Sequence, residues 1–213
     1  FVFSLQSYEI SESTVKYDDQ ESGINMEILD MNHSGKGDLS AETSELDTHT
    51  SALVSFEMDS TNYLNKNKIQ WDALIRVDLN QDKYSFLKNE LLVNQLPLVF
   101  DGFVKLNDDN QEADINFKTP SSDFKNFLAV IPEVYSKDIQ QVKTSGNFTV
   151  AGEFKGIVDE EHIPRFDIKI NSDDASFQYP DLPKSVRNIH IDTQISNTTG
   201  ILEDTEIDIR KLS

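Results

Sequence analysis

The chain has 213 residues, with 38 acidic and 19 basic side chains, a net charge of -19 and a pI near 4.4. So acidic a protein repels phosphate backbones and anionic membrane surfaces alike, which argues against nucleic acid as a partner. The absence of cysteine excludes disulfide frameworks, thiolate nucleophiles and cysteine zinc sites.

The first strand signals are runs of alternating apolar and polar residues. They begin with Ile24, Met26 and Ile28 and continue with Val54, Phe56 and Met58. The clearest run is 69–79, where all six odd positions are apolar: Ile69, Trp71, Ala73, Ile75, Val77 and Leu79. Because side chains alternate across a strand, this run predicts an antiparallel strand with one apolar face and one mostly polar face.

The same alternation follows at Leu96, Leu98, Phe100 and Val104, and again at Ala113, Ile115 and Phe117. Polar clusters such as 107–110 separate these runs and suit hairpin turns, since Asn, Asp and Gly tolerate the backbone angles that turns need.

One region departs from the strand pattern. Phe124, Phe127, Leu128 and Ile131 stand at helical spacing and predict an amphipathic helix over 121–131. Ser121 or Ser122 is the expected cap, and Pro132 ends the helix or starts a turn-rich segment, so we expect one short helical segment near 121–142.

Strands resume after this helix. Three alternating sets follow one another: Phe148, Val150 and Phe154; Phe166, Ile168 and Ile170; and Ile189, Ile191, Thr193 and Ile195. Between the last two, Pro180 and Pro183 interrupt the pattern. Proline cannot donate to a sheet ladder and favours extended geometry before it, so residues 179–183 are expected to be a rigid connector between strands.

A weak internal repeat links two of the predicted strands. Residues 98–105 and 148–155 both read apolar, any, apolar, any, Gly, any, apolar, Lys, with an offset of 50 positions. A glycine inside a strand marks a bulge, a bend or a close approach of another backbone. We therefore interpret the chain as a single β-rich unit, 1–213, with 1–120 and 121–213 as possible repeat units.

The fold class is thus mainly β, with ten or more strands and one helix too short to cover them. Such a sheet folds into a sandwich, closes into a barrel, or curls into an open trough. In the first two the apolar stripes are core, and in the third they are a functional surface.

The sequence carries no recognisable catalytic or metal-binding motif. The four histidines, His33, His49, His162 and His190, lack metal-ligand spacing, and their expected places are surfaces or turns. The acidic clusters 108–110 and 173–174 do not complete a calcium loop, and no nucleophile elbow or phosphate-binding loop is present. We expect no enzymatic activity, no cofactor and no metal.

Several stretches together resemble one known family. They occur in a fixed order over most of the chain: 17–19, 63–65, 94–102, 123–132 with Tyr135, 143–156, 164–166, and FQYPDLPKSV at 177–186 followed by the 189–195 run and Asn197. On these motifs the chain is similar to the AsmA-like proteins of Bacteroidetes-type bacteria.

This resemblance implies a repeating β-groove, a long curled antiparallel sheet that is apolar inside and polar outside. It implies a non-enzymatic protein of the periplasm that shields lipid acyl chains and takes part in phospholipid transport and outer-membrane assembly, with envelope proteins as possible partners. The chain begins with Phe1 rather than Met and has no apolar stretch of about 20 residues, so we expect a fragment whose inner-membrane helix, and hence its membrane contact, lies in missing parts.

The expected groove lining is drawn from three strands: Ile69, Trp71, Ala73, Ile75, Val77, Leu98, Phe100, Val104, Phe148, Val150 and Phe154. The alternative from another class is a structural or adhesive β-sandwich module that binds protein partners, in which the same stripes face each other.

Overall fold

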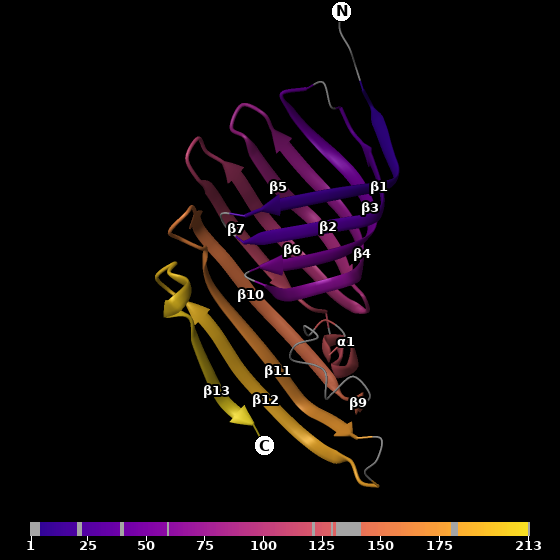
Figure 1. Cartoon of the computed structure of the whole chain (residues 1–213), viewed down its shortest axis with the longest axis vertical. Helices are drawn as coiled ribbons and strands as arrows, with labels where there is room; N and C mark the ends of the chain where they lie inside the picture. The colour runs from indigo at the N-terminus through magenta and orange to yellow at the C-terminus, as the bar shows by residue number, and fades with distance from the viewer. Residues whose placement is uncertain are drawn as a thin grey trace, which may run out of the picture.

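The computed structural model of the chain describes residues 5–20, 23–38, 41–58, 60–120, 122–128, 130, 142–179 and 183–212 (Figure 1). Within these ranges thirteen strands form one antiparallel sheet. The elements are β1 (Ser7–Asp19), β2 (Ile24–Lys36), β3 (Thr43–Met58), β4 (Thr61–Asp78), β5 (Lys83–Val93), β6 (Leu96–Leu106), β7 (Gln111–Lys118), β8 (Ser122–Asp123), α1 (Phe124–Leu128), β9 (Lys143–Ser145), β10 (Asn147–Val158), β11 (Arg165–Gln178), β12 (Val186–Asn197), a 3-10 helix η1 (Leu202–Asp204) and β13 (Glu206–Leu212).

The strands follow chain order across the sheet, from β1 to β7 and then from β10 to β13. The two short strands lie off this path, β8 beside β10 and β9 beside β11. The path ends at β1 and β13, so the sheet stays open. This confirms the predicted fold class, a long curled antiparallel sheet rather than a closed barrel.

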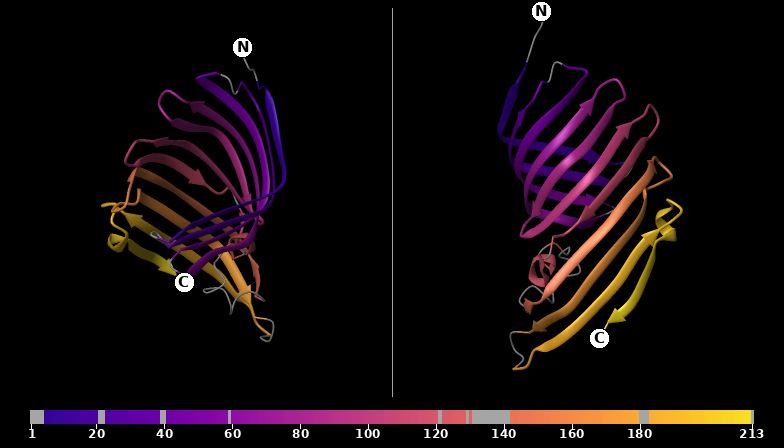
Figure 2. Two further views of the ribbon diagram at one scale, coloured as in Figure 1. Left: turned by 45° about the horizontal axis from the view of Figure 1, so that its top comes forward. Right: turned by 180° about the vertical axis from the view of Figure 1, so that it is seen from behind.

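Bulges bend the N-terminal strands. Register shifts interrupt the β1–β2, β2–β3 and β3–β4 ladders, and Glu12, Asp30 and Lys66 take positive φ angles of 48°, 50° and 51°. A bulge adds an unpaired residue, bends the strand and increases its twist. As a result, part of β1 to β4 runs across the direction of the later strands, which curls the sheet (Figures 1 and 2).

The predicted helix is shorter than expected. Helix α1 has five residues, and Ser122 lies in β8, paired with Phe148, rather than at the helix cap. Asp123 takes the capping place, because its Oδ1 accepts a hydrogen bond from the Lys125 backbone N–H at 3.0 Å. Ser121, Ile131 and the remainder of the predicted helical segment up to residue 141 lie outside the described residues, apart from Val130.

The double-proline stretch falls between two paired strands, as predicted. Strand β11 ends at Gln178 and β12 begins at Val186, and the two are antiparallel neighbours. Residues 180–182 lie outside the described residues. Neither helix in the described part of the chain has the length and apolar character that crossing a membrane requires.

Candidate functional site

A continuous row of paired residues crosses the whole sheet. It contains one residue from each of eleven successive strands: Tyr8, Gly35, Thr48, Ala73, Asn89, Phe100, Phe117, Gly152, Ile168, Ile195 and Ile207. Directly opposite residues on neighbouring strands lie on the same face of a sheet. This row therefore defines one side of the sheet, which we call the apolar face. The other side is the polar face.

The register places all eleven predicted lining residues on the apolar face. On β4 these are the odd positions from Ile69 to Val77, and on β6 and β10 they are the even positions. Ala73, Val150 and Phe148 are buried, with exposed fractions of 4%, 8% and 0%. The other eight are half-buried. Most of this surface thus remains within reach of a ligand.

Three aromatic side chains form a cluster on this face. The ring centroids of Trp71, Phe86 and Phe100 lie 5.5 to 6.3 Å apart, as expected for tilted and edge-to-face pairs. Trp71 Nε1 donates a hydrogen bond to Asn89 Oδ1 at 3.2 Å. We call these three rings the aromatic cluster.

A second line of rings continues the surface across β7, β10 and β11. Phe117 stacks on Phe154 at 5.3 Å, and Phe154 contacts Phe166 at 5.9 Å. A Cβ on Gly152 would lie 2.7 Å from the backbone carbonyl oxygen of Asp167 on β11 and 3.0 Å from the Phe117 ring, so a side chain there would overlap the neighbouring strand and crowd the ring. This explains the glycine of the 148–155 pattern. The two repeat units remain a prediction.

Helix α1 covers one end of the apolar face. Phe127 stacks on Phe148 with ring centroids 4.1 Å apart, and Phe124 contacts the same ring at 5.8 Å. Phe148 is therefore closed to a ligand in this structure, unlike most of the predicted lining. Leu128 ends the helix, but its side chain and Ile131 lie outside the described part.

A row of three hydrogen-bonded polar side chains on the apolar face was not predicted. Tyr8 Oη lies 2.8 Å from His33 Nε2, and His33 Nδ1 lies 2.8 Å from Thr50 Oγ1. Burial lowers the pKa of His33 and raises the pKa of Tyr8. His33 was expected at a surface or turn. The alternation Met31, His33, Gly35 is the sequence signal that places it inside a strand.

We expect the stability of the protein to depend on the protonation of His33. Because its pKa is lowered on folding, the unfolded chain binds more protons once the pH falls below about 6.5, the ordinary histidine value. Above that pH, His33 is neutral in both states and does not lower the free energy of unfolding. As the pH falls toward the folded-state pKa, the unfolded chain gains the proton first, and the free energy of unfolding decreases. Thermal unfolding between about pH 7 and pH 5 should therefore show a flatter pH dependence in His33→Gln than in the wild type. Identical slopes would contradict this assignment.

The polar face carries ion pairs between neighbouring strands. Arg76 binds Glu45 at 2.7 Å, Lys155 binds Asp114 at 2.6 Å, and His49 contacts Asp72. The hydrogen bond to Asp114 raises the pKa of Lys155. Exposed pairs of this kind contribute little stability each.

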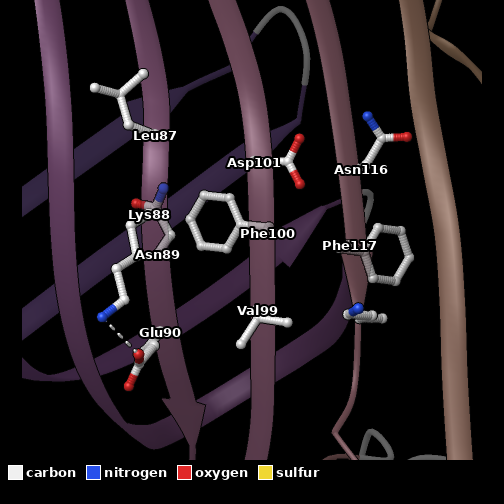
Figure 3. Close-up of a pocket in the computed structure, with 10 residues that line it drawn as sticks. Leu87, Lys88, Asn89, Glu90, Val99, Phe100, Asp101, Asn116 and Phe117 are labelled. Carbon is white, nitrogen blue, oxygen red and sulfur yellow. Dashed lines mark ion pairs between the residues drawn. The ribbon is translucent and has the colours of Figure 1, made fainter.

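Two shallow hollows also lie over the sheet. One, of about 360 Å³, spans β5 to β7 and contains the Lys88–Glu90 ion pair at 3.4 Å (Figure 3). Val99 and Asp101, which line this hollow, belong to the polar face. The N-terminal strands cross behind the hollow in this view. The other, of about 320 Å³, lies over β7, β10 and β11. Neither contains a nucleophile paired with a base, and the described ranges hold no group of three or more side chains placed to bind a metal.

Comparisons of the chain with protein-family models, with curated proteins and with solved structures found no match. The register and the half-buried apolar side chains make the apolar face the candidate site, with the aromatic cluster near its middle.

Proposed function

We propose that the chain holds lipid acyl chains along its apolar face, as a non-enzymatic segment of an AsmA-like periplasmic protein that serves phospholipid transport and outer-membrane assembly. One observation carries this proposal: a register row on one face runs unbroken through eleven strands, and most of its apolar neighbours are only half-buried. Apolar contacts have no direction, so such a surface accepts an acyl chain at many positions along its length.

The energetics favour this use of the surface. Covering apolar area contributes about 25 cal/mol per Å², or about 0.8 kcal/mol for each CH₂ of an acyl chain. The strongly acidic chain does not favour adsorption to an anionic membrane surface, so attraction to lipid must come from apolar contact. Lipid headgroups would then stay at the wet margin of the groove, and no chemistry on the lipid is needed.

The parity of β4 provides the test. A photo-crosslinking amino acid is placed singly at Trp71 or Ile75 on the apolar face, and at Asp72 or Arg76 on the polar face, in the full-length protein in cells. Lipid adducts are identified by mass spectrometry. We expect adducts at the first pair and none at the second, since all four positions lie on one strand and differ only in face. Adducts to protein alone at Trp71 and Ile75 would contradict the proposal.

The alternative, binding of a protein partner, is favoured at one end of the sheet. Strand β13 pairs only with β12 within the described ranges, and its apolar-face residues Ile207, Ile209 and Leu212 are 66%, 60% and 70% exposed. An unpaired edge with exposed apolar side chains is the usual docking place for an added strand. A partner strand there would extend the groove rather than replace it.

A further inference from the structure

Asn89 is a buried asparagine in the middle of an apolar surface. It is 2% exposed and lies in register between Ala73 and Phe100. Its position follows from the bulge between Phe86 and Asn89, which shifts the β5–β6 register.

The amide of Asn89 is only half satisfied. Its Oδ1 accepts the hydrogen bond from Trp71 Nε1, while its Nδ2 is buried and has no partner. The orientation of the amide is fixed by chemistry, because an indole N–H is a donor only and must face the amide oxygen. The free group is therefore a donor.

A second buried asparagine shows what a structural role looks like. Asn197 is also 2% exposed, but its Nδ2 donates to the Ile201 carbonyl at 2.6 Å and to Thr205 Oγ1 at 3.2 Å. Its Oδ1 accepts from the Gly200 backbone N–H at 2.7 Å. Asn197 thus holds the turn between β12 and β13, whereas Asn89 keeps a donor unused beside the aromatic cluster. Buried polar groups are otherwise almost always paired.

We propose that Asn89 Nδ2 donates a hydrogen bond to the carbonyl oxygen of an acyl chain held on the apolar face, and that the aromatic cluster binds the chain next to that carbonyl. This inference rests on the proposed function and deepens it by naming the recognised group. An ester carbonyl suits the site better than a carboxylate. A single neutral donor on an apolar surface compensates a buried anion poorly, and the net negative charge of the protein disfavours the anion further. Nδ2 is covered in this structure, so a neighbouring side chain has to move before the carbonyl of a ligand can reach it.

The test uses the purified chain and three probes: a diester phosphatidylcholine, its diether analogue with the same chains, and a free fatty acid of equal length. Wild-type protein should bind the diester about 3- to 10-fold more tightly than the diether, which corresponds to one hydrogen bond. In Asn89→Leu the two lipids should bind equally, although the substitution also removes the acceptor of the Trp71 Nε1 hydrogen bond. The control is Asn67→Leu, at an apolar-face asparagine that is 9% exposed and whose Oδ1 accepts a hydrogen bond from the Asn65 backbone N–H at 2.9 Å. It loses that local bond but should keep the preference for the diester.

The possible outcomes distinguish failure of the Asn89 inference from failure of the proposed function. Equal binding of diester and diether by the wild type would overturn the role of Asn89 and leave acyl-chain binding in place. Failure of all three probes to bind would overturn both. Tightest binding of the fatty acid would overturn the assignment to esters and identify a carboxylate as the acceptor.

Discussion

Replacing Phe148 with alanine is expected to lower the free energy of unfolding by about 3–5 kcal/mol, as is usual for a large aromatic side chain in a core. Phe148 is fully buried, and it is the ring against which both aromatic residues of α1 pack. Its loss leaves a cavity between β10 and the helix, and it removes the main contact that holds α1 on the sheet. Chemical denaturation gives the magnitude, and hydrogen exchange should show faster opening of β8 and α1.

The control for this prediction is Phe103→Ala. Phe103 lies on the polar face, half-buried, with Lys83 Nζ 3.7 Å from its ring centroid. A partly exposed ring with one cation contact should contribute about 1 kcal/mol. Equal losses in the two variants would contradict the role of Phe148 as a core residue packed under α1.

Replacing Gly102 with alanine is expected to separate β6 from β7 locally and to cost about 3 kcal/mol or more, since backbone strain and a steric clash add. Gly102 has a φ of +131°, and a Cβ there would lie 1.9 Å from the carbonyl oxygen of Asp114 and 2.9 Å from the Cα of Ile115. Both atoms belong to the backbone of β7, so no side-chain rotation relieves the overlap.

Gly156→Ala separates the two causes. Gly156 has nearly the same φ, +136°, but a Cβ there would meet nothing nearer than 3.9 Å. This variant should lose only the strain, about 1–2 kcal/mol. Denaturation midpoints give the difference, and hydrogen exchange of the β6–β7 ladder locates it. A loss at Gly156 as large as at Gly102 would show that φ alone decides the cost.

The strands were predictable where alternation runs without interruption. In β4 the odd positions from Ile69 to Val77 carry the apolar side chains, and the register puts them together on one face. The helix was predicted from Phe124 and Phe127, whose spacing lets both reach Phe148. Its cap was wrong, because the sheet pairs Ser122 with β10 before the helix can begin.

The bends and the buried polar groups were not predictable in the same way. A bulge shifts the alternation by one residue. On β5 the next apolar-face residue after Phe86 is therefore Asn89 and not Lys88, and on β2 the next one after Ile28 is Met31 and not Asp30. Nothing in the local sequence requires this: Glu12, Asp30 and Lys66 have positive φ angles although none is a glycine. Counting alternate positions from the start of β5 places Asn89 on the polar face, where an unpaired amide has no consequence.

The strand order has a consequence for how the chain acquires its structure. Every strand on the path from β1 to β13 pairs with the one before it in the chain, apart from the step from β7 to β10 around the helix. Apart from that step, the loops between paired strands are short, and within the described ranges no strand from the start of the path pairs with one from its end. Each new strand can pair with the edge of the strand formed before it, as successive repeats pack on one another in solenoid proteins. We therefore expect the sheet to grow strand by strand from one end while the rest of the chain is still unfolded.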